Sequence, residues 1–415
     1  MGSEMCIRDR YIALAASFFL VLIGVLSLQD FFSYIDLNVV GLLIGMAVIT
    51  SYLEDSGLTE WVSFKLIKTV GQNPTRILIM FTLVGSLLSA ILDNVSTTLL
   101  LAPVAISIAR KLNVSSIPYV LGIALGSNLV GAALMIGDPP SMMVASALDL
   151  SFIDFIIFQG KPSMFFLILA ACPFAALTLK FTTKKYFSGE SKEIKTLNFS
   201  GVLIKSKLLL VEVLAILALV IFLLSIRNIY YTPLWFPPIF GALLLTLIRL
   251  PKENAFKRFV FDVDWKTIVF ISCIFVVVGG LVKTGFVSML SLEIYRLCQK
   301  NLVIASTILI WISVLLSAFI DNIPYFAMMI PLVIKLSNLS GMNVYTLMWA
   351  LLLGGSLGGN CTFIGAAANA VGVGIIEKNE KKKISLLEFM KIGVPFTITA
   401  VTVGQILHFI FYILL

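Results

Sequence analysis

Charged residues are scarce in this chain. Only 13% of its 415 residues are Asp, Glu, Lys or Arg, whereas 59% are hydrophobic and the mean hydropathy is +1.04. A soluble protein of this length needs far more polar surface, so the composition predicts an integral membrane protein. The apolar stretches run to about 20 residues and lack the alternating pattern of a membrane β-barrel, which indicates transmembrane helices.

Histidine and closely spaced cysteines are also lacking. His408 is the only histidine, which excludes a His-rich site, and the five cysteines form no pair that would indicate a disulfide framework or a metal site. No nucleophile–base pair or metal-ligand set appears, so we expect a protein that is not an enzyme and needs no cofactor. The net charge of +8 does not indicate a nucleic-acid partner, because the basic residues gather on one side of the predicted membrane.

Nine full spans are predicted from the apolar stretches, and two of them, 117–147 and 344–374, are long and interrupted by Gly and Pro. Two further apolar blocks, 75–110 and 301–337, carry Asp-Asn at their middle. A block bent at a polar midpoint can enter and leave the membrane on one face, as a re-entrant hairpin. The predicted fold class is an all-α polytopic membrane protein with about 9–11 transmembrane helices and two re-entrant hairpins. The other spans are 11–28, 37–53, 163–181, 208–226, 233–250, 265–283 and 391–415.

The two halves of the chain repeat one another at a fixed offset of 228 residues, and the register holds without a gap from about 36 to 141. Chance similarity of apolar segments does not readily place Asp-Asn, Gly and Pro together in this way. We divide the chain into a first span (1–35), repeat 1 (36–181), a cytoplasmic loop with two linking spans (182–263) and repeat 2 (264–415). Ser89, Ala90, Asp93, Asn94, Pro103 and Gly137 fall on Ser317, Ala318, Asp321, Asn322, Pro331 and Gly365.

The basic residues predict the orientation of the repeats. With the N-terminus in the cytoplasm and each hairpin counted as no crossing, 24 of the 30 Lys and Arg residues fall inside and 6 outside. This obeys the positive-inside rule and puts the C-terminus outside, in what we expect to be the plasma (inner) membrane. The repeats are then inverted and the hairpins enter from opposite faces. Secondary transporters have this architecture, with the site at the midplane where the repeats meet.

Two kinds of feature are predicted near the membrane interface. The segments 57–71 and 285–299 have the pattern of amphipathic helices that lie at the interface and support the hairpins. Glu54 and Asp55 end the second span near the inner face, where we expect them to be solvated. Glu212, a turn inside the fifth span, is expected to be interfacial or paired with another polar group.

Four polar clusters lie at membrane depth. Capping of a helix is one explanation, and it is strongest for Asp138, which precedes two prolines. An ionised Asp at the bilayer centre costs at least about 2.5 kcal/mol, however, whereas a cap contributes roughly 1 kcal/mol, so we interpret the clusters as a binding site. The hairpin tips hold Ser89, Asp93, Asn94, Ser96, Thr97 and Thr98, and Ser317, Asp321 and Asn322; the interrupted spans hold Asn128, Gly137, Asp138 and Ser141, and Asn360, Thr362, Gly365 and Asn369.

The chemistry of these clusters favours a cation. They contain no Lys or Arg, and carboxylates, amides, hydroxyls and unwound carbonyls together suit Na⁺, which we place at Asp93, Asn94, Asp321 and Asn322. The same carboxylates can exchange H⁺. An anion or metalloid permease for arsenite, citrate or another carboxylate stays open, because half-helix N-termini attract anions. A channel or scaffold is the third reading, and the buried carboxylates argue against it.

These motifs resemble a known group. "SAILDNVSTTLLLAP" (89–103), "GSNLVGAALMIGDPPS" (126–141), "SAFIDNIPYFAMMIP" (317–331) and "LGGSLGGNCTFIGAAANAV" (353–371) are similar to the signature segments of the ion-transporter superfamily. Within it they are most similar to the arsenite permeases, NhaD-type sodium–proton antiporters and the P protein, which share a citrate transporter-like domain. The resemblance covers about 11–415.

The resemblance implies an 11-helix type of fold, a homodimer in the lipid bilayer, and an elevator motion of the part that carries the hairpins. It places the tip positions of the family at Asp93-Asn94 and Asp321-Asn322. Two departures stand out. Dicarboxylate carriers have Ser-Asn-Thr at the tips, so Asp-Asn argues against dicarboxylate transport. The group usually shows Thr and Asn around the first Gly-Asp-Pro-Pro break, where this chain has Leu134 and Ser141.

Overall fold

The computed structural model is almost entirely helical and describes residues 2–58, 61–62, 65, 73–187, 204–250, 261–298 and 300–415. The first half contains α1 (Gly2–Leu22), α2 (Leu28–Ser33), α3 (Leu37–Asp55), α5 (Pro74–Ser89), α6 (Asn94–Leu112), α7 (Ile117–Gly131), α8 (Pro139–Ala147), η1 (Phe152–Phe155), the antiparallel strands β1 (Ile157–Phe158) and β2 (Lys161–Pro162), α9 (Met164–Thr182) and η2 (Lys184–Tyr186). The linking helices are α10 (Lys207–Tyr230) and α11 (Phe236–Arg249). The second half contains α13 (Trp265–Lys283), α14 (Phe286–Cys298), α15 (Leu302–Ser317), α16 (Asn322–Ser340), α17 (Val344–Gly358), η3 (Gly359–Cys361), α18 (Ala367–Glu380), α19 (Leu386–Phe409) and η4 (Ile410–Leu414).

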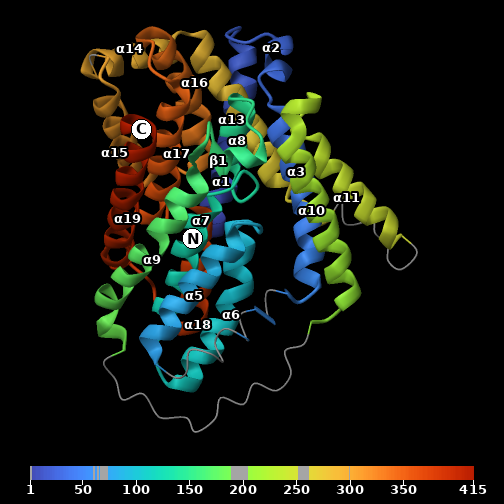
Figure 1. Ribbon diagram of the computed structural model, residues 1–415, viewed down its shortest axis with the longest axis vertical. Helices are drawn as coiled ribbons and strands as arrows, with labels where there is room; N and C mark the ends of the chain where they lie inside the picture. Colours follow the sequence, from blue (N-terminus) through green and yellow to red (C-terminus); the bar gives the residue numbers. More distant parts are fainter. Residues whose placement is uncertain are drawn as a thin grey trace.

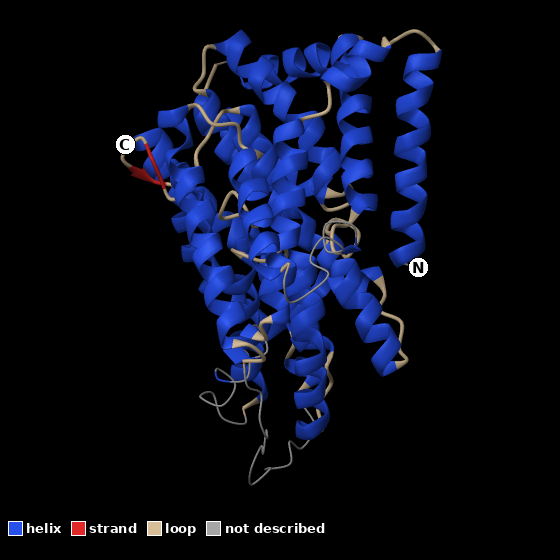
Figure 2. Cartoon of the chain, turned by 90° about the vertical axis from the view of Figure 1, so that its right-hand side faces the viewer, coloured by secondary structure: helices blue, strands red, loops and turns tan. Residues whose placement is uncertain are grey.

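Most helices run along the long axis of the molecule, as Figure 2 shows. Within the described residues, seven are long and apolar enough to cross a membrane: α3, α6, α9, α10, α13, α16 and the run Leu386–Leu414. Five shorter apolar helices accompany them, namely Arg10–Leu22, α5, α7, α11 and α15. The predicted all-α polytopic membrane fold is confirmed.

The helix boundaries follow the repeat in the sequence. α3, α5 and α6 begin and end 228 residues before α13, α15 and α16, and α8 begins 228 residues before α18. Matching N-cap residues explain this agreement, because Asp or Asn side chains accept the free backbone N–H groups that open each helix. The paired caps are Asp36 and Asp264, Asn73 and Asn301, and Asp93 and Asp321.

The two predicted hairpins lie in opposite halves of the molecule. In Figure 1, α5 and α6 occupy the lower half, whereas α15 and α16 occupy the upper half. The chain turns at 90–93 in the first hairpin and at 318–321 in the second. The long predicted spans are also broken, at 132–138 between α7 and α8 and at 359–366 between α17 and α18. Two turns and two helix breaks therefore come from the two halves of an inverted repeat.

Some predicted boundaries were wrong. The first span was expected at 11–28, but α1 ends at Leu22, because Gly24 has a φ of +75° and Ser27 caps a separate short helix, α2. The last span was expected to begin at 391 and begins at Leu386, because the Ser385 side chain caps the helix by accepting the backbone N–H of Glu388. The predicted amphipathic segment 285–299 is α14, whereas most of 57–71 lies outside the described residues.

A surface ion pair fixes the short helix α2 on α13. Lys283 Nζ lies 2.6 Å from Asp30 Oδ2, and Ser27 donates to the same carboxylate. The hydrogen bond from Lys283, followed by that from the Ser27 backbone, holds the pKa of Asp30 down at about 2. A depressed pKa makes this contact stabilising above the ordinary Asp range and weaker only as the pH falls towards 2. The contact therefore does not respond to pH in the neutral range.

The linking helices share a buried ion pair. Glu212 on α10 is bonded to Arg249 on α11, and their side chains are only 17% and 7% exposed. Both helices pack against α3, where Gly41 and Gly45 lie against Trp235 and Pro238. The pair therefore joins α10 to α11, and both helices pack on α3 to form a three-helix unit. Glu212 is paired, which was one of its two predicted states.

We expect Glu212→Gln to destabilise the protein by about 3–5 kcal/mol, because buried Arg249 loses its counter-charge. Denaturant or thermal unfolding in detergent measures this change. Glu293→Gln is the matched control, since its partner Arg296 and Glu293 itself are 64% and 56% exposed. That control is expected to change stability by less than about 1 kcal/mol. Equal losses in the two variants would contradict a structural role for the buried pair.

Candidate ion-binding site at the two helix breaks

Each hairpin tip is closed by an aspartate cap. Asp93 Oδ1 accepts the backbone N–H groups of Val95 and Ser96, both at 2.9 Å, and Asp321 Oδ1 accepts that of Ile323 at 3.0 Å. Both carboxylates are half-buried. These bonds all go to Oδ1, so the second oxygen of each carboxylate takes no part in capping. Capping and ion binding are therefore compatible at these residues.

Four asparagines connect the two halves of the chain. Asn94 on α6 donates to Asn128 Oδ1 on α7 at 2.9 Å. Asn128 in turn donates to Asn360 Oδ1 at 2.9 Å and to Asn369 Oδ1 at 3.0 Å. Asn360 donates back to the carbonyl of Leu125 at 2.9 Å. We call Asn94, Asn128, Asn360 and Asn369 the asparagine network. It fixes the second helix break against α7 of the first repeat.

Glycines allow the backbone to cross closely at both breaks. A Cβ on Gly137 would lie 3.0 Å from the Ser89 carbonyl and even closer to the Gly131 carbonyl. A Cβ on Gly365 would clash in the same way with the Ser317 carbonyl. In each half, a carbonyl oxygen of the hairpin limb and one of the preceding helix or break therefore converge on this glycine. Such clusters of unwound carbonyls suit cation coordination.

The serine at the end of each first hairpin limb has different partners in the two halves. The Ser317 hydroxyl lies 2.7 Å from Asn322 Oδ1 and 2.6 Å from the Gly355 carbonyl. The Ser89 hydroxyl is fully buried and has no hydrogen-bond partner, although it lies against Gly131 at the first break. A buried hydroxyl without a partner costs about 1–3 kcal/mol, which a bound ligand would offset.

A second difference between the halves lies in the breaks themselves. The Thr362 hydroxyl donates to the Ala318 carbonyl and accepts the N–H groups of Ile364 and Gly365. Leu134 stands at the equivalent position of the first half and cannot donate to the carbonyl of Ala90. The second break is therefore closed by side-chain hydrogen bonds, whereas the first keeps more oxygen atoms available.

The remaining predicted residues lie around this centre. Asp138 is buried and caps α8 through the Ser141 N–H at 3.0 Å, and the Ser141 hydroxyl donates to the Ala132 carbonyl at 3.1 Å. Thr98 donates to the Asn94 carbonyl at 2.9 Å, while the buried Thr97 hydroxyl has no partner. The structure thus gathers the two breaks and the first residues of α6 and α16. The role of these residues in binding stays a prediction.

Glu54 is a nearby carboxylate whose position the sequence did not reveal. It was expected to be solvated, but it is half-buried on α3 and interacts with Ser96, and it also experiences the charge of Asp93. Ser96 therefore faces α3 rather than the asparagine network. Val282 occupies the equivalent position in the second repeat, so this carboxylate is present in one half alone. A charged residue directly at the end of a predicted span was the available signal.

The electrostatic character of the site is neutral to negative. None of the residues at the hairpin tips, at the helix breaks or in the asparagine network carries a positive charge. The two buried arginines of the described residues are paired elsewhere, Arg227 with Asp149 at 2.6 Å and Arg249 with Glu212. Amides, hydroxyls, carbonyls and carboxylates are the groups that remain for a ligand.

Inverted repeats, opposed hairpins and two facing helix breaks define a membrane transporter. The profile of the citrate transporter family matches residues 5–354, which is most of the chain. The protein therefore belongs to the citrate transporter family, within the ion-transporter superfamily that its motifs resemble. It is a transporter and not an enzyme.

Relatives and a solved structure agree with this assignment. An uncharacterized transporter of Mycobacterium tuberculosis is 33% identical, over 99% of this chain and 95% of the relative. The human P protein is 27% identical over 91% of this chain and 54% of its own length. The crystal structure of the YdaH transporter of Alcanivorax borkumensis has a TM-score of 0.61 at 13% identity, over 95% of this chain and 87% of that one. That structure supports the fold alone.

We expect Asn128→Ala to destabilise the protein by about 1–3 kcal/mol, because Asn94, Asn360 and Asn369 all lose a buried partner. Ser356 is the matched control, since it stands at the equivalent position of α17 and its buried hydroxyl has no partner. Ser356→Ala is expected to be nearly neutral. Thermal unfolding in detergent compares the two variants, and an Asn128→Ala protein as stable as Ser356→Ala would contradict the network's role.

Proposed function

We propose that the protein exchanges Na⁺ and H⁺ across the membrane, as a secondary transporter with its site at the two helix breaks. The observation that carries this proposal is the charge of the site. Asp93 and Asp321 cap the helices that begin at the two hairpin tips, Asp138 caps the helix after the first break, and no basic side chain stands among the site residues. A cation would be attracted there, whereas a dianion would meet three carboxylates.

Of the two breaks, the first offers more oxygen atoms that could bind a cation. The Ser89 hydroxyl has no protein partner, and the carbonyls of Ser89 and Gly131 converge near Gly137. Leu134 leaves the Ala90 carbonyl without the hydroxyl donor that Thr362 gives to Ala318. Together with Asp93 and Asn94 at the tip, these oxygens offer several ligands to Na⁺. The second break, whose oxygens are already hydrogen-bonded, would serve more as a support.

Exchange requires that the site meet each side of the membrane in turn. We propose an elevator motion in which the hairpins and broken helices move against the unit formed by α3, α10 and α11. The proposal includes a homodimer in the plasma (inner) membrane, with the N-terminus in the cytoplasm and the C-terminus outside. The asparagine network supports the division into a moving part and a fixed part, because its hydrogen bonds join the helices of both repeats that we propose to move together.

A second candidate is the transport of citrate or another carboxylate, or of a metalloid such as arsenite. The family match favours this candidate, since the matching profile is that of a citrate transporter. α6, α8, α16 and α18 all begin at the tips or breaks, and their N-termini could attract an anion. In that case Na⁺ or H⁺ would be the coupling ion that screens the aspartates.

Transport in proteoliposomes separates the two candidates. A pH-sensitive dye is enclosed, and Na⁺, Li⁺, arsenite or citrate is added in turn. We expect Na⁺ alone to drive proton movement, and Asp93→Asn or Asp321→Asn to abolish it, because each removes a carboxylate at a tip. The control variant is Asp30→Asn, which removes a carboxylate from α2 at the surface. This variant should show the same proton flux as the unchanged protein. Proton movement with citrate alone, or unchanged flux in both tip variants, would contradict the proposal.

Ser89 and Ser317 allow a matched comparison within one protein. We expect Ser89→Ala to raise the Na⁺ concentration for half-maximal flux about tenfold, which corresponds to the loss of about 1.4 kcal/mol of ligand contact. Its stability should not fall, since no protein hydrogen bond is lost. Ser317→Ala should instead lower stability by about 1–3 kcal/mol. If both variants lose stability equally while Na⁺ dependence stays the same, the first break is not the cation site.

A further inference from the structure

A basic pocket lies between α6 and α18, at the ends of these helices and away from the breaks. Its volume is about 630 Å³. It joins one helix from each repeat, since α6 belongs to the first hairpin and α18 follows the second break. We call it the α6–α18 pocket. Its lining residues are Pro103, Ile106, Ser107, Arg110, Lys111, Ile375, Lys378 and Asn379.

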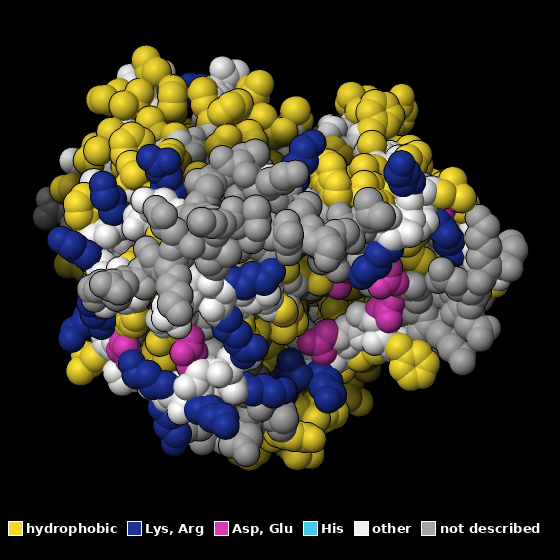
Figure 3. All heavy atoms as spheres, turned by 90° about the horizontal axis from the view of Figure 1, so that it is seen from below, with side chains coloured by type: hydrophobic (Ala, Val, Ile, Leu, Met, Phe, Trp, Pro, Cys, Tyr) yellow, Lys and Arg dark blue, Asp and Glu magenta, His cyan; other side chains and the backbone are white. Residues whose placement is uncertain are grey.

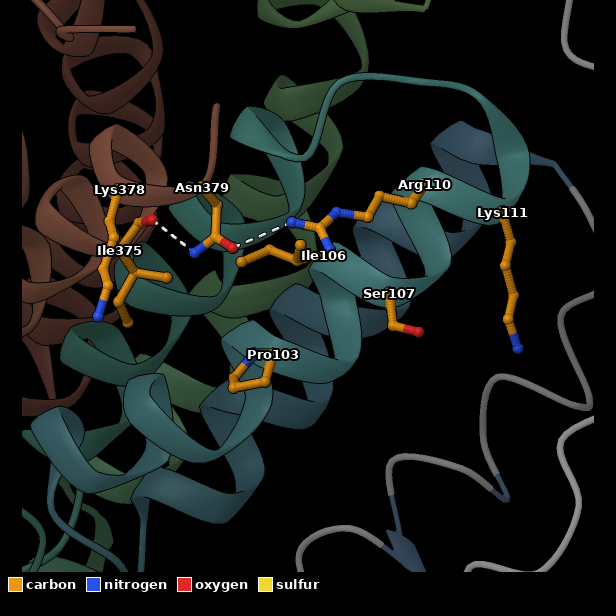
Figure 4. Close-up of a pocket in the computed structure, with 8 residues that line it drawn as sticks. All are labelled: Pro103, Ile106, Ser107, Arg110, Lys111, Ile375, Lys378 and Asn379. Atoms are coloured by element: carbon orange, nitrogen blue, oxygen red, sulfur yellow. Dashed lines mark hydrogen bonds between the residues drawn. The ribbon is translucent and has the colours of Figure 1, made fainter. Parts of the chain in front are cut away.

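The pocket has basic groups at its rim and an apolar floor. Figure 4 shows Arg110 reaching from α6 towards Asn379 on α18, above Ile106 and Pro103. The Arg110 guanidinium donates to Asn379 Oδ1 at 3.2 Å, and Asn379 Nδ2 donates to the Ile375 carbonyl at 2.9 Å. Figure 3, the view from below, shows that many other Lys and Arg side chains share this end of the molecule.

Arg110 and Lys378 line the pocket from its two helices, within the part of the chain that the structure describes. Neither Arg110 nor Lys378 has a carboxylate partner there. The two acidic residues next to Lys378 are engaged elsewhere. Glu380 accepts the N–H of Ser116 at 2.9 Å and its hydroxyl at 2.6 Å, and Glu377 accepts the N–H of Ile384 at 3.1 Å.

Basic residues in the last turn of a helix also offset the helix dipole, and that role alone would explain Arg110, Lys111 and Lys378 separately. It does not require that cations from two helices line the same cavity. Nor does it explain an apolar floor of Pro103, Ile106 and Ile375 directly beneath them. A cationic rim over an apolar floor matches a ligand with an anionic head and a hydrocarbon tail.

We propose that the α6–α18 pocket binds the phosphate headgroup of an anionic phospholipid from the predicted cytoplasmic leaflet. Arg110 and Lys378 meet the phosphate, and the apolar floor receives the first part of the acyl chains. Basic pockets between membrane helices on the cytoplasmic side are suited to such headgroups. The bound lipid would bridge α6 and α18 and so join the two repeats at a point far from the asparagine network.

Native mass spectrometry of the full-length protein tests this assignment, with phosphatidylglycerol, cardiolipin or phosphatidylcholine added in known amounts. The variant is Arg110→Ala with Lys378→Ala. The matched control is Lys207→Ala with Lys383→Ala, which removes the same charge from exposed positions outside the pocket. All of these positions are exposed, so folding should persist, and size-exclusion profiles and melting curves verify it.

We expect the pocket variant to bind the anionic lipids about thirtyfold more weakly, in line with roughly 1 kcal/mol for each basic side chain, and the control to bind as before. Phosphatidylcholine should bind weakly to all forms. Equal losses in both variants would reduce the effect to general surface charge and overturn the proposal. Stabilisation by inorganic phosphate that matches the lipid would instead assign the pocket to a soluble anion, and it too would overturn the proposal.

Discussion

The hydrogen bonds among Asn94, Asn128, Asn360 and Asn369 are the interaction on which the centre of this protein depends. A membrane interior offers no water to the backbone groups that are freed where a helix breaks, so other protein groups must satisfy them. Two helix breaks and two hairpin turns meet in this fold. Neutral amides can donate and accept at once, and they satisfy such groups without the cost of buried charge. The network therefore lets two broken helices coexist at the centre.

The repeat is symmetric in its backbone and asymmetric in its chemistry. Helix bounds recur at the same spacing, yet the residues at equivalent positions differ. Thr362 corresponds to Leu134, Asp138 to Ala366, and Glu54 to Val282. At the second break, the Thr362 hydroxyl and the Ala318 carbonyl are already joined by hydrogen bonds that fix the backbone of the break. The first half keeps the buried Ser89 hydroxyl without a partner, and it has Asp138 and Glu54 in addition to the tip carboxylate Asp93, which corresponds to Asp321. The oxygen atoms left without a protein hydrogen bond are therefore distributed unequally between the two halves.

The sequence predicted the fold well where local chemistry decides it. Apolar length located the spans, and Asp or Asn caps located the helix starts at Asp93 and Asp321. It failed where contacts distant along the chain decide the outcome. Ser89 and Ser317 occupy the same repeat position, yet only Ser317 is bonded. Asn322 accepts from Ser317, whereas Asn94, the equivalent of Asn322, is bonded to Asn128 on α7. Glu54 was expected in solvent, and its packing beside Ser96 depends on how α3 lies on the first hairpin. The domain boundaries and the roles of the site residues stay predictions.

Proton release on Na⁺ binding is the measurement that tests the central claim most directly. The purified protein is titrated with NaCl in a weakly buffered detergent solution, with KCl as the control for ionic strength, and the released protons are measured. The account predicts a saturable release of protons with NaCl that KCl does not produce and that is absent when Asp93 is replaced by Asn. Identical traces with NaCl and KCl, together with saturable binding of citrate in the absence of Na⁺, would contradict it.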